Sequence, residues 1–259
     1  MTDKKIGFIG SGRVTRILLG GFKRCGKYPE NIVASDVDIG ALDSLRRRFP
    51  WVETVRGDNS KSASQEIIIL ALHPPAIAGV LEEIRSFIKP RAMVISLAPK
   101  ITIEKLSALL GGFGRVCRMI PNACSIVNAG YNPVAFSKAL SESDKEIVES
   151  VFSVLGDCPV VSEEKLEAYA MLTAMGPTYF WFQWEELENI AESFGLSSIE
   201  AKDGLYKMVV GAAKAMYESG LSETEIMDLI PAKPLKEKEA DIAAAYKSIL
   251  GELYKKLKI

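Results

Sequence analysis

The stretch GFIGSGRVT, residues 7–15, decides the fold that this sequence predicts. A short apolar run from Ile6 to Ile9 enters it, and an amphipathic pattern from Arg13 to Cys25 follows it. A strand, a glycine-rich turn and a helix in this order indicate a dinucleotide-binding βαβ unit. In such a unit Gly10 allows the tight turn, and Gly12 lets a pyrophosphate approach the helix N-terminus. The alternative is a turn whose glycines serve only the backbone geometry.

The third small-residue position of this pattern is occupied by Thr15. Glycine or alanine is usual there, because helix and strand pack closely, so threonine weakens the match. We expect the turn to bind a nicotinamide dinucleotide through the following residues: Gly10, Ser11, Gly12, Arg13 and Val14.

The rest of the chain extends this unit into a parallel sheet covered by helices. Strands are expected at Ile6 to Ile9, Ile32 to Ser35, Glu66 to Leu72, Ala92 to Leu97 and Val116 to Ile120, and more weakly near Val52, Tyr131 to Phe136 and Pro159 to Val161. Helices are expected between them at Arg13 to Cys25, Asp38 to Phe49, Ala76 to Phe87, Ile103 to Leu110 and Ser143 to Leu155.

After about Ser162 only helical patterns remain, at Glu163 to Thr173, Pro177 to Phe194, Ser198 to Tyr217, Glu223 to Leu229 and Lys236 to Leu257. The predicted fold class is therefore α/β. A Rossmann-type, doubly wound and mostly parallel sheet domain is expected over residues 1–161, and an all-helical domain over residues 162–259.

The expected helix from Pro177 to Phe194 carries an unusual concentration of aromatic residues: Tyr179, Phe180, Trp181, Phe182 and Trp184. So many rings need burial on more than one face of the helix. They form either the core of the helical domain or a dimer interface, because a domain of this size has a limited interior.

Composition favours a small-molecule partner in a reducing compartment. The formal charge is −1, from 32 basic and 33 acidic residues, so no global field attracts nucleic acid or an anionic membrane. The four cysteines form no CxxC pair, and with one histidine they predict no metal site. We find no signal-peptide pattern at the N-terminus and no apolar run long enough to span a bilayer, so we expect a cytoplasmic protein.

Asp36 follows the second expected strand, where the residue that reads the adenosine ribose is usually found. A carboxylate accepts hydrogen bonds from both ribose hydroxyls and repels a 2′-phosphate, so Asp36 favours NAD. NADP stays open, because Arg46, Arg47 and Arg48 lie one helix away. The alternative role for Asp36 is to cap the next helix.

Several blocks resemble the pyrroline-5-carboxylate reductase family in the same order. They are GFIGSG at 7–12, Asp58-Asn59, the strand ending in Ala71-Leu72-His73-Pro74, the block Arg118-Met119-Ile120-Pro121-Asn122, Glu163-Glu164, and Gly176-Pro177-Thr178-Tyr179. The resemblance implies reduction of a cyclic imine, 1-pyrroline-5-carboxylate, to L-proline with NAD or NADP. It also implies a homodimer through the C-terminal helices.

By this resemblance the further cofactor-binding residues are Asn59, Ala71, Leu72, Pro74 and Ala98, and the substrate-binding residues are Met119, Pro121, Gly176 and Pro177. Asn122 is expected to position the substrate or the nicotinamide, unless it is only a turn residue. His73 is a candidate general acid, since imidazole gives up a proton near neutral pH. Its alternative role is packing beside the cofactor.

The chain departs from the family on the substrate side. The family's Ser-Pro-Gly-Gly-Thr-Thr loop, whose amides and hydroxyls hold the substrate carboxylate, aligns with Ile230-Pro231-Ala232-Lys233-Pro234-Leu235. Pro234 has no amide hydrogen to donate. Lys233 could supply a positive charge instead, or belong to a solvated surface. A diverged reductase of another imino or keto acid, and a non-catalytic dinucleotide-binding protein, are therefore the alternative functions.

Overall fold

The computed structural model describes residues 4–26, 28–29 and 31–258. The chain divides into two compact units. The first contains the chain up to Ala174 together with the segment from Tyr254 onward, and the second is Met175–Leu253. Each unit is described by itself.

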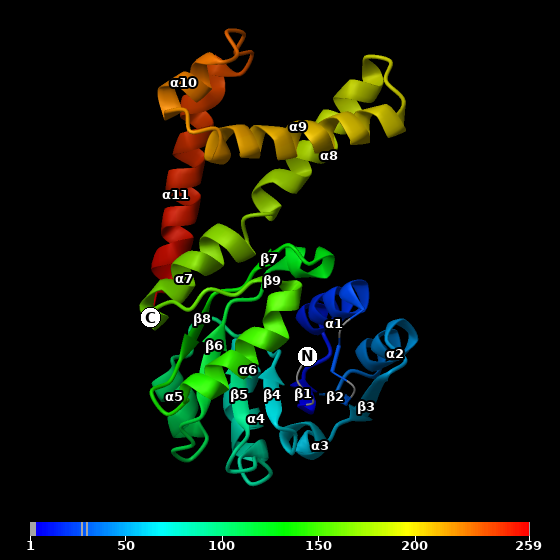
Figure 1. Ribbon diagram of the computed structural model, residues 1–259, viewed down its shortest axis with the longest axis vertical. Helices are drawn as coiled ribbons and strands as arrows, with labels where there is room; N and C mark the ends of the chain where they lie inside the picture. The colour runs from blue at the N-terminus through cyan, green and yellow to red at the C-terminus, as the bar shows by residue number, and fades with distance from the viewer. Residues whose placement is uncertain (1–3, 27, 30, 259) are drawn as a thin grey trace. The chain divides into compact units, whose positions relative to one another are not determined.

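A seven-stranded sheet forms the centre of the first unit, in the order β3-β2-β1-β4-β5-β6-β8 (Figure 1). All neighbouring strands are parallel except β6 and β8, which are antiparallel. This order is that of two mononucleotide-binding halves that meet between β1 and β4, which confirms the predicted Rossmann-type sheet. The strands are β1 Ile6–Ile9, β2 Ile32–Asp36, β3 Val52–Arg56, β4 Ile67–Leu70, β5 Met93–Ser96, β6 Val116–Met119 and β8 Val134–Phe136; β7 Gly130–Tyr131 and β9 Gly156–Asp157 pair separately.

Helices cover both faces of this sheet (Figure 1). In β4, Ile67 and Ile69 join one buried cluster with α1, α2 and α6, whereas Ile68 and Leu70 join the other with α3, α4 and α5. An all-apolar strand is what burial on both faces requires. The helices are α1 Arg13–Cys25, α2 Ile39–Arg48, α3 Ser60–Ala63, α4 Pro74–Ile84, α5 Ile103–Leu109, α6 Glu142–Phe152 and α7 Leu166–Tyr169, with shorter turns at Ala123–Val127, Ser153–Leu155, Glu163–Lys165 and Ala170–Ala174.

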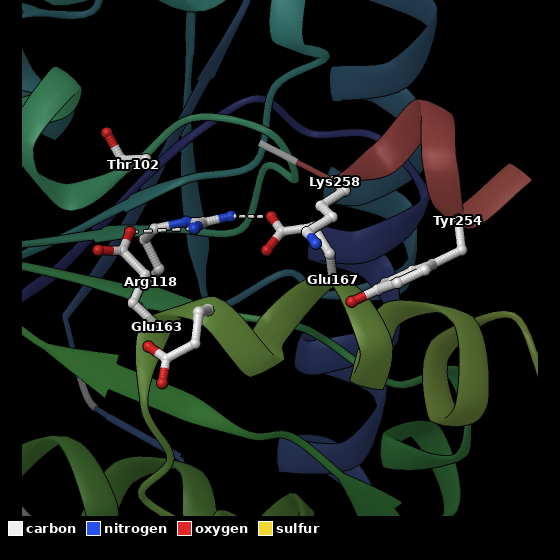
Figure 2. Close-up of a pocket in the computed structure, with 7 residues that line it drawn as sticks. Thr102, Arg118, Glu163, Glu167, Tyr254 and Lys258 are labelled. Atoms are coloured by element: carbon white, nitrogen blue, oxygen red, sulfur yellow. Dashed lines mark hydrogen bonds and ion pairs between the residues drawn. The ribbon is translucent and has the colours of Figure 1, made fainter.

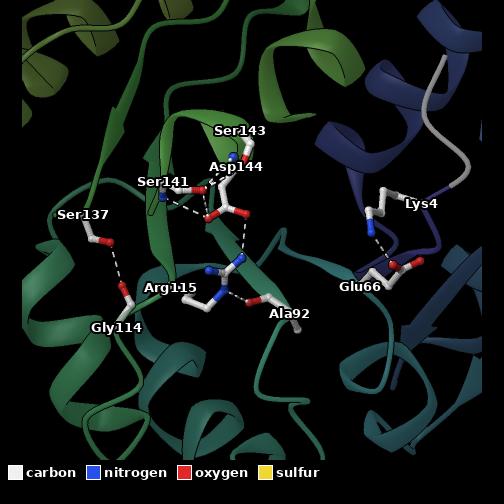
Figure 3. Close-up of polar contacts among 9 residues, drawn as sticks. All are labelled: Lys4, Glu66, Ala92, Gly114, Arg115, Ser137, Ser141, Ser143 and Asp144. Carbon is white, nitrogen blue, oxygen red and sulfur yellow. Dashed lines mark hydrogen bonds and ion pairs between the residues drawn. The ribbon is translucent and has the colours of Figure 1, made fainter. Parts of the chain in front are cut away.

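The start of α6 is fixed by a capping box between Ser141 and Asp144 (Figure 3). The Oδ1 atom of Asp144 also lies 2.7 Å from Nη2 of Arg115, and Nε of Arg115 donates to the carbonyl of Ala92. This ion pair joins α6 to the amino-terminal ends of β5 and β6, because Ala92 and Arg115 each precede one of those strands.

The second unit consists of α8 Thr178–Ser193, α9 Ser198–Glu218, α10 Glu223–Asp228, a turn at Lys236–Lys238, and α11 Glu239–Leu257, whose last residues belong to the first unit. Capping boxes at Ser197 and Ser222 start α9 and α10. No residue of α8 is buried within the described chain. Its aromatic residues therefore do not form the core that was one of the two expectations for this helix.

Several expected boundaries were wrong. Helix α4 begins earlier than expected, at Pro74, because proline suits the first position of a helix. The segment expected as one strand from Tyr131 to Phe136 is split between β7 and β8. Beyond β9, Val160 makes only an isolated bridge to Val134.

The contacts divide the chain after Ala174, whereas the expected domain boundary was at residues 161 and 162. The segment between these positions stays with the sheet because Leu166 and Ala170 pack against Ile120 and Ala135 in a third buried cluster. Helical sequence thus begins before the second compact unit does.

Candidate functional site

Glycine occupies positions 10 and 12 of the first turn for different structural reasons. Gly10 has φ +100°, and a Cβ atom there would lie 2.4 Å from the carbonyl oxygen of Ala71, so the fold itself requires glycine. Gly12 has φ −71°, which any residue can adopt, and a Cβ atom there would meet nothing within 4 Å. The fold therefore does not need glycine at this position, and the backbone there is open to the approach of a ligand. The backbone-only alternative therefore explains Gly10 and not Gly12.

Helix α1 begins directly after this turn and has the properties of an anion site. Its N-cap is Gly12, which has no side chain to cap the helix, and its first turn contains no acidic residue. The first amide groups of a helix have no intrahelical acceptor, and the helix dipole attracts negative charge there. Arg13 and Val14 occupy the first two positions. These features fit the pyrophosphate of a dinucleotide.

Thr15 is accommodated without an unpaired polar group. Its side chain is fully buried, and its hydroxyl donates a hydrogen bond of 2.6 Å to the carbonyl of Gly10. The hydroxyl thus stabilises the turn by a hydrogen bond to its backbone. Threonine in place of the usual glycine or alanine is therefore compatible with the turn geometry.

Asp36 lies at the carboxyl end of β2, beside the turn. Its Oδ2 atom accepts from the amide of Ser11 at 2.7 Å and from the hydroxyl of Ser11 at 2.9 Å. Partial burial raises the pKa of Asp36, but hydrogen bonds from Asp38 and Ser11 outweigh this, and the net pKa is below the ordinary value. The helix-capping alternative was wrong, because Asp38 accepts from Gly40 and Ala41 and caps α2 itself.

Asn59 belongs to a polar chain beside Asp36. The hydroxyl of Ser35 donates to Oδ1 of Asn59 at 2.7 Å, and Nδ2 of Asn59 donates to the carboxylate of Glu83, with both oxygens at 3.2 Å. Glu83 was not among the residues expected from the sequence. It lies 24 positions from Asn59 on α4, and no local pattern indicates that they meet.

The end of β4 brings the expected residues Ala71 to Pro74 to the carboxyl edge of the sheet. The amide of Ala71 donates to the carbonyl of Ile9, so this segment lies directly beside the glycine-rich turn. The side chain of Leu72 reaches the space in front of Gly10. His73 is exposed, and within the described chain its imidazole has no hydrogen-bond partner.

The expected residues after β5 and β6 differ in their accessibility. Ala98 is buried at the end of β5, and Pro121 is half-buried. Met119 was expected to contact the substrate, and this requires correction: its side chain is fully buried in the first core cluster and has no surface to offer a ligand.

Asn122 is buried, and chain groups hold both ends of its side-chain amide. Its Oδ1 accepts from the amide of Cys124 at 2.8 Å, and its Nδ2 donates to the carbonyl of Thr173 at 2.7 Å. The turn role left open in the sequence analysis is therefore present. One Nδ2 hydrogen remains beyond these contacts.

A buried ion-pair network that was not expected from the sequence lies beside β6 (Figure 2). Arg118 is fully buried, and its Nη1 and Nη2 atoms lie 3.0 Å from Glu163 and 2.5 Å from Glu167. With Tyr254 and Lys258 these residues line a cavity of about 280 Å³. A charged residue in the apolar strand VCRM was the available signal, since a buried charge needs a partner.

The remaining expected substrate residues lie in the second unit. Gly176 is buried, and Pro177 directly precedes the first residue of α8. Lys233 is exposed and lines an open cavity with Glu223, Glu225 and Asp228, among other residues. The negative charges of these carboxylates offset the positive charge of Lys233 and disfavour the binding of an anion there.

The described residues contain neither a metal-binding cluster nor a membrane-spanning helix. No group of three or more histidine, cysteine, aspartate or glutamate side chains is placed to hold a metal ion. No helix in the described part of the chain is long and apolar enough to cross a membrane.

Comparison with known proteins agrees with this geometry. The family model described as "NADP oxidoreductase coenzyme F420-dependent" matches residues 5–100. The pyrroline-5-carboxylate reductase of Methanosarcina acetivorans is 30% identical over 236 residues, which cover 89% of this chain and 85% of the relative. A pyrroline-5-carboxylate reductase structure from Coxiella burnetii aligns with a TM-score of 0.73 and 28% identity over 99% of this chain and 95% of its own.

The structure of Plasmodium falciparum pyrroline carboxylate reductase with NADP bound aligns with a TM-score of 0.87 over 100% of this chain and 98% of its own. At 20% identity this likeness shows the shared fold. The sequence match to the Methanosarcina acetivorans relative covers most of both chains at 30% identity and shows the family as well as the fold. The chain belongs to the pyrroline-5-carboxylate reductase family.

Proposed function

We propose that this protein reduces 1-pyrroline-5-carboxylate to L-proline with NADH or NADPH. The observation that carries the proposal is the open backbone at Gly12, at the uncapped start of α1, in a chain of this family. The nicotinamide supplies the hydride for the C=N bond of the cyclic imine and is oxidised to NAD(P)⁺, and a proton completes the reduction.

The chain's own residues hold the cofactor along the carboxyl edge of the sheet. The turn around Gly12 would bind the pyrophosphate, and Asp36 and Asn59 would face the adenosine ribose. The nicotinamide half would lie across the ends of β4 and β5, where the proposed contacts are Ala71, Leu72, Pro74 and Ala98.

Two residues at this edge are proposed for the reaction itself. His73 is exposed and has free nitrogen atoms for a proton donor's role, with packing beside the cofactor as its alternative. Asn122 has one Nδ2 hydrogen left to position the substrate or nicotinamide. For substrate binding we propose Pro121, Gly176 and Pro177. The acidic surroundings of Lys233 favour a solvated surface for that residue.

Turnover of 1-pyrroline-5-carboxylate with NADH and with NADPH, followed by absorbance, tests the proposal. Oxidation of either cofactor that depends on the imine, with L-proline as product, is the expected result. Tight NADH binding without oxidation would contradict it and support a non-catalytic binding protein. Turnover only with other cyclic imines or keto acids would identify a diverged reductase, as the altered loop Ile230 to Leu235 allows. A His73→Gln variant assayed across pH separates proton donation, which lowers kcat, from packing, which raises KM for the cofactor.

We also propose a homodimer through the C-terminal helices in a cytoplasmic setting. The supporting observation for the dimer is the exposure of large apolar side chains on α8 and α9, including Phe182 at 65% and Ile199 at 82%. The occupant we propose for this surface is the same surface of a second copy. Cys25, Cys117, Cys124 and Cys158 form no disulfide within the described chain, which fits a reducing compartment.

A further inference from the structure

Lys100 has a backbone conformation that is unfavourable for its residue type. Its φ is +68°, in the left-handed region where the Cβ atom of an L-residue is crowded. Lys100 follows Ala98 and Pro99 in the loop after β5. An observed strain of this kind persists only where surrounding contacts impose it, and such positions are frequent at functional sites.

Glu167 supplies one contact that holds Lys100 in place. The amide of Lys100 donates to Oε1 of Glu167 at 3.2 Å. The same oxygen pairs with Nη2 of Arg118 (Figure 2), and both side chains are almost completely buried. Arg118 thereby fixes the position of an oxygen that in turn holds the loop after β5.

Glu163 makes a parallel contact that holds a different segment. Its Oε1 atom accepts from the amide of Ile103 at 2.7 Å and pairs with Nη1 of Arg118 at 3.0 Å. Ile103 begins α5, outside the loop after β5. The two glutamates therefore share Arg118 but differ in the backbone group that they fasten.

The position of this loop links it to one half of the cofactor. In the strand order, β1, β2 and β3 form the first mononucleotide-binding half, and β4, β5 and β6 form the second. The glycine-rich turn and Asp36 belong to the first half. Ligands bind at the carboxyl ends of the strands, so the loop from Ala98 to Lys100 borders the nicotinamide half.

From this arrangement we propose that Glu167, held by Arg118, is a positioning residue for the nicotinamide half of the cofactor. It acts through the amide of Lys100 and fixes the loop that begins at Ala98. The inference rests on the proposed use of NAD(P)H, but it does not require pyrroline-5-carboxylate to be the substrate.

The test compares the affinities for NADH and for ADP-ribose, which lacks the nicotinamide. The Arg118→Met/Glu167→Leu variant removes the acceptor together with the buried cation that pairs with it. Glu163 also loses Arg118, but its side chain is 30% exposed and keeps the hydrogen bond from the amide of Ile103. We expect it to weaken NADH binding about tenfold, the effect of one lost positioning hydrogen bond, and to leave ADP-ribose affinity within about twofold. Unchanged ADP-ribose affinity also shows that this variant is folded.

Two further variants separate positioning from a general structural role. Glu167→Gln keeps an oxygen at the same atom, so it should bind NADH within about twofold of the parent protein. Adding Lys100→Gly to the double variant should recover at least about threefold of the lost NADH affinity, because glycine adopts positive φ without strain. Glu163→Leu is the matched control, expected to leave NADH affinity unchanged.

Equal losses of NADH and ADP-ribose affinity, unchanged NADH affinity in the double variant, or no recovery with Lys100→Gly would each overturn the proposal. These binding measurements use no imine. A parent protein that binds NADH but does not turn over pyrroline-5-carboxylate would therefore reject the proposed function and leave this inference intact.

Discussion

The amide and hydroxyl of Ser11 both donate to Oδ2 of Asp36, at 2.7 and 2.9 Å. The carboxylate is thereby fixed over the glycine-rich turn, and these hydrogen bonds help keep its pKa below the ordinary value despite partial burial. Its other oxygen, Oδ1, accepts from the amide of Asp38. An ionised and oriented carboxylate thus stands where the adenosine ribose of a dinucleotide is read.

Replacing Asp36 is expected to change the preference between the two nicotinamide cofactors. In Asp36→Ser the charge that repels a 2′-phosphate is lost, and Arg56, paired with Asp36 in the sheet register, remains. The ratio of kcat/KM for NADPH to that for NADH should rise about tenfold or more, equivalent to about 1.4 kcal/mol. The control is Asp43→Ser on the exposed face of α2, which should leave the ratio unchanged. An unaltered ratio in Asp36→Ser would exclude a role in selecting the cofactor.

Alanine substitutions at the two glycines of the turn should affect different properties, stability at Gly10 and NADH affinity at Gly12. Gly10→Ala forces a Cβ atom against the Ala71 carbonyl at positive φ and should lower the free energy of unfolding by about 2 kcal/mol or more. Gly12→Ala has free space and ordinary φ, so its free energy of unfolding should change by less than about 0.5 kcal/mol. Its NADH affinity should nevertheless fall about tenfold or more. Denaturant unfolding and NADH fluorescence measure these effects, and a Gly12→Ala variant with parental affinity would contradict the assigned role.

These turns and strands were predictable because their signals are local. Gly12 and Gly26 bound α1, and its first and last residues, Arg13 and Cys25, match those expected. The apolar run of β4 indicated burial on both faces, and the structure places alternate residues in separate clusters. Local steric rules and hydrophobic patterns are sufficient for elements of this kind.

The parts that escaped prediction depend on long-range contacts. Glu167 lies 67 positions from Lys100 and 49 from Arg118 along the sequence, and nothing local indicates which backbone amide its carboxylate accepts from. The expectation for Met119 was wrong for a similar reason. Its motif predicted a contact with the substrate, whereas the alternation of side chains along the strand directs it into the core. Motifs locate an edge of the sheet, and tertiary packing decides which side chains face a ligand.

The Arg115–Asp144 ion pair predicts a dependence of stability on pH. Burial raises the pKa of Asp144, but the hydrogen bonds and charge of Arg115 and Ser141 lower it by more than burial raises it. The folded pKa is therefore below the unfolded value of 3.8. The stabilisation is therefore fully present above about pH 4 and is lost as the pH falls through the folded pKa. At pH 7, Asp144→Asn should lower the free energy of unfolding by about 2 kcal/mol. This difference should shrink below pH 4.

Denaturant unfolding at several pH values measures this effect. Glu142→Gln, at the same helix start, is the control, because Glu142 is exposed and its pair with Lys145 should contribute less than about 0.5 kcal/mol. A difference between Asp144→Asn and the parent protein that is equally large below the folded pKa would contradict the ion-pair explanation.

The exposed apolar surface of α8 and α9 predicts the oligomeric state. Sedimentation of the 28.3 kDa chain should give twice the monomer mass, because burial of this surface against a second copy removes large apolar side chains from water. Phe182→Glu places a charge in that interface and should raise the dimer dissociation constant at least about 100-fold, equivalent to about 2.7 kcal/mol. Phe87→Glu is the matched control, since Phe87 is also an exposed apolar residue but belongs to the first unit. A parent protein that sediments as a monomer, or equal effects of the two substitutions, would reject these helices as the interface.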